Sequence, residues 1–103
     1  MYELYKKLIT LNTSIDKKYR YSLSESTIAS CNDCIEQLIL AKHAPKAIKE
    51  TYIIVADAKA ELTALKIRAM LELKLANATN LLKLQAKLTE ARRQIGGWRK
   101  SVM

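Results

Sequence analysis

The sequence has very few of the residues that make tight turns: 2 glycines and 1 proline among 103 residues. A β-sandwich or β-barrel of this length needs many turns, and turns depend on these residues, so β-rich folds are excluded. Long apolar runs are missing too, since none approaches the roughly 20 residues of a membrane span. The first residues contain no apolar stretch long enough for a secretory signal. We therefore expect a protein without membrane segments.

Cysteine is scarce, and the two cysteines do not make a disulfide framework. Cys31 and Cys34 have C-x-x-C spacing, but a zinc site needs four ligands, and His43 is the one other soft candidate. A redox motif would lie at a helix start beside a strand, and no strand is expected. We predict buried reduced thiols, no metal site and a reducing cytoplasm as the compartment.

Signatures of catalysis are also missing. The sequence contains no glycine-rich phosphate loop, no nucleophile elbow and no paired acidic motif. His43 has no acidic or nucleophilic partner nearby and is interpreted as a helix C-terminal residue. We predict that the protein is not an enzyme, with no catalytic residues and no cofactor. A small helical enzyme with an Arg- and Lys-lined pocket for an anionic substrate is kept as an alternative.

What the sequence does contain is a basic, helix-forming composition. Half of the residues are apolar, and 18 basic side chains against 10 acidic ones leave a net charge of +8. The length corresponds to a single domain, residues 1–103. Ala, Leu, Lys, Ile and Glu dominate, and these residues favour helices. The high positive charge raises the question of an acidic partner.

The periodicity of apolar residues predicts four helices, over Tyr2–Ile15, Leu23–Lys42, Lys46–Ala76 and Asn80–Lys100. A polar connection leads to the second helix, where Ser22 and Glu25 fit a capping box. Pro45 is expected to open the third helix, and Asn77–Asn80 to form a tight reversal. Because short connections favour antiparallel neighbours, we predict an all-α, up-and-down antiparallel four-helix bundle.

The third predicted helix has two apolar faces. One stripe comprises Ile48, Tyr52, Val55, Ala58, Leu62, Leu65, Ala69, Leu73 and Ala76. The opposite stripe comprises Ile53, Ala60, Ala64, Ile67, Leu71 and Leu75. One stripe can pack into the bundle, and we assign the second to contacts between subunits. The alternative is that sister helices of the same bundle cover both stripes.

Charges are sorted along the flanks of the same helix. One flank carries Glu50, Asp57, Glu61 and Glu72, and the other carries Lys49, Lys59, Lys66 and Lys74. In a head-to-tail ring, the acidic edge of one subunit could meet the basic edge of the next. The pattern is therefore consistent with a homo-oligomer.

The fourth predicted helix carries most of the excess positive charge. Against the single acid Glu90 it places Lys83, Lys87, Arg92, Arg93, Arg99 and Lys100. Such a basic stripe suits contacts with nucleic-acid phosphates, whose strength falls steeply with salt. No signature of a base-specific DNA or RNA module is present, so any binding is directed by shape and backbone. The alternative is a solvated face that keeps the protein soluble.

Gly96–Gly97 before the single tryptophan, Trp98, is the most particular local feature. A glycine inside a helix costs about 1 kcal/mol relative to alanine, so an adjacent pair implies a reason. We predict close packing of a neighbouring element against the glycines, with Trp98 closing the end of the bundle. The alternative is a helix C-cap followed by a loose tail.

Four short segments together resemble a known family. They are the basic turn Lys17–Leu23, the helix end Leu38–Ala41, the segment Ala58–Leu65, and the closing Ile95–Ser101 with its Gly-Gly-Trp. With these the chain resembles the Avd-like family, the accessory variability determinants of diversity-generating retroelements. That family is related to the four-helix proteins encoded in intervening sequences of bacterial large-subunit rRNA.

The resemblance implies a homopentameric barrel of four-helix bundles. It also implies a noncatalytic subunit that binds RNA and DNA, or an RNA/DNA hybrid, and associates with a reverse transcriptase during mutagenic cDNA synthesis and retrohoming. On this basis we expect nucleic-acid contacts from Arg20, Lys66, Arg68, Arg92, Arg93, Arg99 and Lys100, joined from the charge pattern by Lys83 and Lys87. Two alternatives are a standalone RNA-binding protein of the rRNA intervening-sequence type and a helical protein–protein scaffold.

Overall fold

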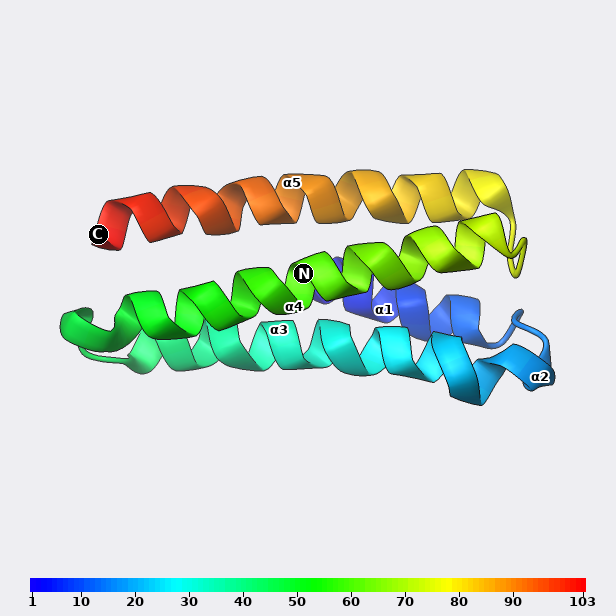
Figure 1. The fold of residues 1–103 in the computed structure, drawn as a ribbon, viewed down its shortest axis with the longest axis horizontal. Coiled ribbons are helices and arrows are strands. Elements are labelled where there is room, and N and C mark those ends of the chain that lie inside the picture. Colours follow the sequence, from blue (N-terminus) through cyan, green and yellow to red (C-terminus); the bar gives the residue numbers. More distant parts are fainter.

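The computed structural model describes all residues from Met1 to Met103, and it contains helices and no strand. The four long helices are α1 (Tyr2–Asn12), α3 (Glu25–His43), α4 (Lys46–Glu72) and α5 (Ala78–Val102). Successive long helices run in opposite directions along a molecule 44 Å long (Figure 1). The predicted all-α architecture of four helices is thereby confirmed. No helix is both long enough and apolar enough to span a membrane.

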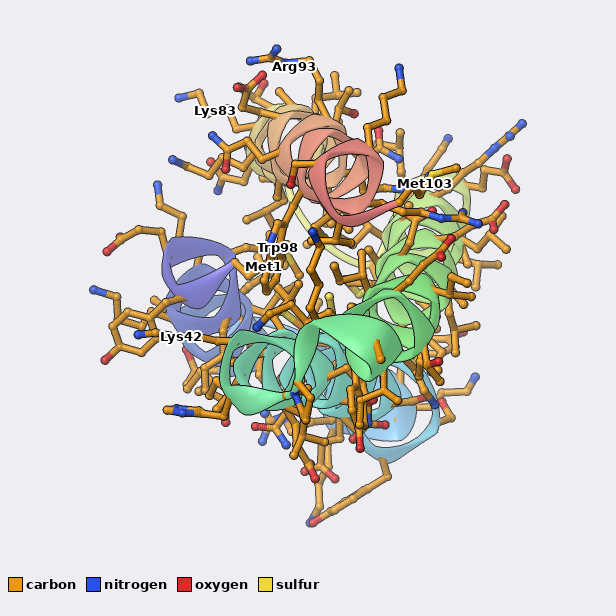
Figure 2. All side chains as sticks on the ribbon, turned by 90° about the vertical axis from the view of Figure 1, so that its left-hand side faces the viewer. Met1, Lys42, Lys83, Arg93, Trp98 and Met103 are labelled. Atoms are coloured by element: carbon orange, nitrogen blue, oxygen red, sulfur yellow. The ribbon has the colours of Figure 1, made fainter.

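The helices are arranged so that α1 and α4 lie diagonally across the bundle. Each of them packs against α3 and α5, and they do not contact one another. In the view along the bundle, α1 lies on the left, α4 on the right, α5 at the top and α3 at the bottom (Figure 2). The outer surface of α4 and the surface between α1 and α5 therefore face different sides of the molecule.

The connection between α1 and α3 is helical, not the polar loop with a capping box that the sequence predicts. The Asp16 carboxylate accepts a hydrogen bond from the backbone N–H of Lys18 at 3.0 Å and opens α2 (Lys17–Tyr19). The chain continues through one π-helical segment, η1 (Arg20–Ser24), into α3. The Ser22 hydroxyl donates to a backbone carbonyl three residues earlier at 3.4 Å. Because Asp16 starts the helix early, Ser22 lies inside it and does not cap it.

The other turns follow from single residues. Pro45 is the N-cap of α4 and has an extended backbone. It therefore lies one position before the first helical residue, whereas the sequence predicted that it would be that first residue. Helix α4 ends at Glu72, earlier than predicted, since Lys74 adopts a left-handed φ of 57°. The Asn77 side chain accepts from the backbone N–H of Asn80 at 3.1 Å and caps α5. A short reversal is present as predicted, but it lies earlier, over residues 73–77, and residues 78–80 already belong to α5.

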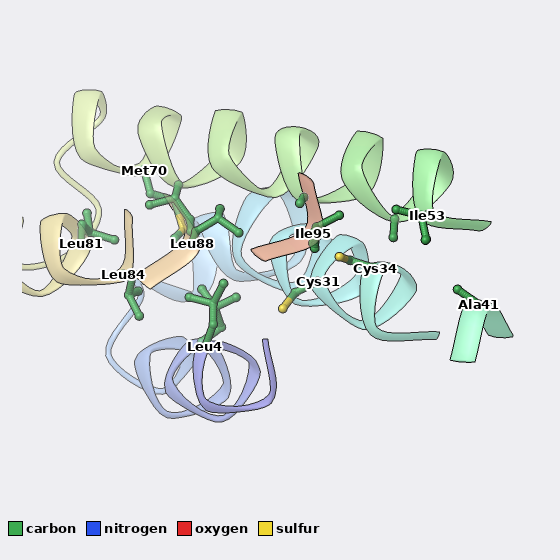
Figure 3. Close-up of a cluster of buried hydrophobic side chains, with 14 residues drawn as sticks. Leu4, Cys31, Cys34, Ala41, Ile53, Met70, Leu81, Leu84, Leu88 and Ile95 are labelled. Carbon is green, nitrogen blue, oxygen red and sulfur yellow. The ribbon is translucent and has the colours of Figure 1, made fainter. Parts of the chain in front are cut away.

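One apolar cluster of 14 buried residues links all four long helices (Figure 3). Its members are Leu4, Leu8, Cys31, Cys34, Ala41, Ile53, Ala56, Ala60, Ile67, Met70, Leu81, Leu84, Leu88 and Ile95. Fully burying one leucine or isoleucine side chain stabilises a fold by about 1.5 to 3 kcal/mol. The regular seam of α5 confirms the predicted spacing of the last helix.

The two apolar stripes of α4 have exchanged roles relative to the prediction. Of the residues assigned to subunit contacts, Ile53, Ala60 and Ile67 are fully buried inside the subunit. The other three, Ala64, Leu71 and Leu75, pack against the same core. The stripe predicted to face the core instead contains most of the exposed apolar residues of α4, namely Ile48, Val55, Leu62, Leu65 and Leu73. The predicted oligomer interface is therefore wrong in its residues.

A hydrogen bond between small polar side chains explains which stripe faces inward. The buried Thr63 hydroxyl lies 2.8 Å from the Ser30 hydroxyl of α3. Each hydroxyl also bonds to a carbonyl of its own helix, Thr63 to Lys59 and Ser30 to Thr27. Buried hydroxyls need such partners, and small residues let two helices approach closely. The opposite stripe of α4 offers larger side chains and no such partner for Ser30.

The charged flanks of α4 act within the subunit. On the acidic flank, Asp57 and Glu50 face α5, where each pairs with an arginine. On the basic flank, Lys49 donates to the backbone carbonyls of Ala41 and Lys42 at 2.8 and 3.0 Å, satisfying the C-terminus of α3. These contacts hold α4 between its two neighbours and engage part of each flank, whereas Glu61 and Lys74 are exposed and belong to no ion pair.

Candidate nucleic-acid interface

The candidate interface is built on α5, a 25-residue helix with a regular apolar seam. Because Leu81, Leu84, Leu88 and Ile95 face the core, the cationic residues between them lie on the flanks and the outer surface. In the view along the bundle, Lys83 and Arg93 extend from α5 away from the other helices (Figure 2). Several of these cations form ion pairs with acidic side chains.

Two arginines of α5 belong to the packing of the bundle. Arg92 lies 3.5 Å from the carboxylate of Asp57, and Arg99 lies 3.4 Å from that of Glu50. All four side chains are half-buried at the contact between α4 and α5. Half-exposed pairs of this kind contribute about 0.2 to 1 kcal/mol each. The positive charges of Arg92 and Arg99 are therefore largely balanced by the neighbouring carboxylates of Asp57 and Glu50.

Two more arginines are paired on the surface. Arg93 donates to both carboxylate oxygens of Glu90, at 3.0 and 2.6 Å, and the guanidinium lowers the pKa of that carboxyl. Arg68 on α4 pairs with Glu72 at 3.0 Å. Both pairs are exposed, so a phosphate could displace the carboxylate, but the local net charge of each is zero.

Arg20 and Lys66 are directed into the protein. The Arg20 guanidinium donates to the carbonyls of Ile15 at 3.0 Å and Thr13 at 3.4 Å, in the turn that follows α1. The Lys66 ammonium donates to the hydroxyl of Ser26 at 2.7 Å and to its carbonyl at 3.1 Å, joining α4 to α3. Both side chains have structural roles, and we remove them from the set of candidate contacts.

Lys83, Lys87 and Lys100 remain as cations without a partner. All three are exposed, and none takes part in the six ion pairs of the structure. Lys83 and Lys87 are one turn apart on the flank of α5 that faces α1, since each lines a hollow between these two helices. These three lysines are the predicted contact residues that neither pair with an acidic group nor bond within the protein.

Lys7 of α1 is absent from the predicted contacts, yet the fold places it on the same side. It lines a hollow together with Lys83, although the two residues are far apart in the sequence. Lys7 lies in a basic segment that contains tyrosines, a pattern that suits phosphate contacts but does not distinguish Lys7 from Lys6. The antiparallel packing of α1 on α5 brings Lys7 and Lys83 to the same hollow.

The two cysteines are buried and free, as predicted. Burial raises the pKa of the Cys31 thiol to about 11 and that of Cys34 to about 12. Both thiols are therefore protonated at neutral pH and poor nucleophiles. No group of three or more His, Cys, Asp or Glu side chains is close enough together to hold a metal ion.

The glycine pair is not explained by internal packing. Helix α5 continues through Gly96 and Gly97 to Val102, but a Cβ added at either glycine would meet no atom within 4 Å. The predicted close approach of another element is therefore wrong. Trp98 packs against the core near Met1 at the end of the bundle, as expected (Figure 2). Nothing else in the subunit requires glycine here.

Comparison of the chain with known protein families, with curated proteins and with solved structures finds no match. The resemblance to Avd-like proteins thus stays a prediction from the sequence.

Proposed function

We propose that this protein is a noncatalytic nucleic-acid-binding subunit, and that it serves as the accessory protein of a diversity-generating retroelement. In this role it would bind template RNA, and DNA or an RNA/DNA hybrid, beside a reverse transcriptase during mutagenic cDNA synthesis. The observation that carries the proposal is the set of unpaired lysines on α5, Lys83, Lys87 and Lys100, on a protein of net charge +8. The Gly-Gly-Trp segment and the other resembling segments add the link to the retroelement.

The subunit is proposed to work as a homo-oligomer that assembles through the outer stripe of α4. Leu65 and Leu73 on this stripe are 57% and 58% exposed, and Ile48, Val55 and Leu62 extend the stripe along the helix. A continuous apolar stripe of this kind on a long helix is typical of a surface covered by another protein. A second copy of the chain is the occupant that the resemblance supports, and five copies would form the barrel.

Nucleic-acid binding is tested by removing the unpaired charges. We expect Lys83→Gln/Lys87→Gln/Lys100→Gln to weaken binding of single-stranded RNA by tenfold or more at moderate salt, measured by fluorescence anisotropy. The matched control Lys17→Gln/Lys42→Gln/Lys46→Gln changes the net charge equally, on exposed residues outside α5. Equal losses in both variants would mean that binding follows net charge alone and would remove α5 as the interface.

Assembly is tested by the mass of the particle in solution. Light scattering after size-exclusion chromatography should give a multiple of 11.7 kDa, five for the barrel, and Leu62→Lys/Leu65→Lys should reduce it to one subunit. A wild-type mass of one subunit at micromolar concentration in moderate salt contradicts the assembly. Association with a polymerase is tested by co-purification with a candidate reverse transcriptase, with the bound nucleic acid extracted and sequenced.

The exposed stripe of α4 also supports a second candidate function, a helical scaffold that binds proteins and no nucleic acid. The same measurements separate the two. A scaffold keeps its oligomeric mass and binds no RNA at low salt. The proposed subunit keeps its oligomeric mass and binds RNA.

A further inference from the structure

The surface between α1 and α5 is hollowed into a polar groove of about 470 Å³. One wall is the second half of α1 with the residues that follow it, and the other is the first two turns of α5. Eight residues line the groove, and Leu11 and Leu84 are the two apolar ones. No aromatic ring lines it. The lining therefore offers no ring on which a base could stack.

The charges around the groove have one sign. Lys7 enters from α1 and Lys83 from α5, and no carboxylate lines the groove. Neither lysine belongs to an ion pair, whereas the neighbouring Lys6 lies 2.9 Å from Glu3. Both side chains carry a positive charge at neutral pH, so both would attract an anion that binds in the groove.

The two helix ends at the groove have opposite polarity, because the C-terminus of α1, the negative end of its dipole, lies on one wall and the N-terminus of α5 on the other. The N-terminus of α5, the positive end of its dipole, begins two residues before the lining residue Asn80. On the opposite wall, the carbonyl of Thr13 accepts from the Arg20 guanidinium, which brings a further positive charge to the end of α1. The site thus rests on the two lysines that line a common groove.

We propose that this groove holds a phosphate of a nucleic-acid backbone between Lys7 and Lys83. This inference rests on the proposed nucleic-acid function and names the place where the strand is held. Lys87 lies one turn further along α5 and lines a second hollow against α1, where Glu3 and Glu90 also lie, so the carboxylate-free groove is the favoured phosphate site. At this groove the strand is contacted through its phosphates, without reading of the bases.

The position of the groove is compatible with assembly. The groove opens between α1 and α5, whereas the apolar stripe lies on α4, diagonally across the bundle from α1 (Figure 2). Subunits that meet through α4 leave the groove accessible. Each copy then offers one groove to the same strand, and repeated phosphate contacts multiply affinity.

The test compares Lys7→Gln/Lys83→Gln with Lys7→Arg/Lys83→Arg and with the control Lys17→Gln/Lys46→Gln. Binding of a labelled single-stranded RNA of about 20 nucleotides is measured between about 0.05 and 0.3 M salt. We expect the groove Gln variant to bind at least tenfold more weakly, with the slope of log K against log salt reduced by about 1.4. The Arg variant and the control should stay within about threefold of wild type, since both leave the groove cationic.

A second measurement observes the groove directly. The side-chain amide of Asn80 lines the groove and makes no hydrogen bond in the subunit, so its NMR signals should shift when RNA is added. The groove is overturned if wild type binds RNA while the Gln variant binds equally well, or no more weakly than the control. That result leaves the proposed function standing, whereas wild type that binds no RNA at low salt removes both proposals.

Discussion

The two faces of α4 carry apolar residues at similar helical spacing but have opposite fates. The inner face consists of Ile53, Ala56, Ala60, Thr63, Ile67 and Met70, all fully buried. The outer face carries Ile48, Val55, Leu62, Leu65 and Leu73, all large and all exposed. The face with the smaller and more polar side chains is the one inside. Summed hydrophobicity therefore does not decide which face packs into the bundle.

Which face of α4 is buried depends on how well its side chains fit against the neighbouring helix. Small side chains let α4 lie close to α3, and the Ser30–Thr63 hydrogen bond satisfies two hydroxyls that would be costly to bury alone. The larger outer residues remain for a partner that packs at a greater distance. The inner face thus belongs to the fold of one subunit, and the outer face to its proposed assembly.

The largest effect is expected from shortening an inner residue. Ile67→Ala should lower the free energy of unfolding by about 3 kcal/mol, because it leaves a cavity in the core. The matched control is Leu65→Ala on the outer face, where the isolated subunit should lose less than about 1 kcal/mol. Chemical denaturation of dilute protein measures both. Equal losses would contradict the distinction between the faces.

The next effect concerns pH and the thiols beneath the inner face. The folded thiols keep their protons up to pH of about 11 and 12, whereas unfolded cysteine ionises near pH 9, so stability falls as pH rises above 9. Between pH 7 and 10 the two thiols together should account for about 3 kcal/mol. Cys31→Ala/Cys34→Ala starts less stable but should lose less over this range in denaturant titrations. If variant and wild type lose the same amount, water reaches the thiols.

A smaller effect is expected at the hydrogen bond that orients α4. Thr63→Val keeps the shape but removes the hydroxyl that meets Ser30, and should cost about 1 to 2 kcal/mol. Thr63→Ser retains the hydroxyl and separates this loss from that of the methyl group. Thr51→Val, at an exposed position, serves as the control in the same thermal or chemical unfolding experiment. If Thr63→Val leaves the free energy of unfolding unchanged, the Ser30–Thr63 hydrogen bond does not explain which face of α4 is buried.

The smallest effect is expected at the glycine pair. Since nothing lies near a Cβ at Gly97, Gly97→Ala should raise the stability of the subunit by up to about 1 kcal/mol. If a partner approaches the backbone here, the same variant should weaken assembly or RNA binding while the subunit itself becomes more stable. Loss of subunit stability would show that the glycine has an internal role after all.

The sequence predicted the helices better than their ends and faces. The seam of α5 and the cap at Asn77 followed from spacing and residue type, because both depend on neighbours within a few residues. The start of α2 was missed although Asp16 is a strong N-cap, since Ser22 and Glu25 offered a competing signal. The candidate site was predicted in part: Lys83, Lys87 and Lys100 remain available, whereas Arg20 and Lys66 turned out to be structural.

The sequence by itself determined an all-helical single domain with a cationic last helix and buried thiols, because these features follow from composition and local periodicity. Only the tertiary structure decided which face of α4 is inside, which cations are paired, and that Lys7 and Lys83 line one groove. The physical reason is that packing distance, ion pairing and hydrogen-bond partners depend on residues brought together from different helices. No spacing along a single helix contains that information.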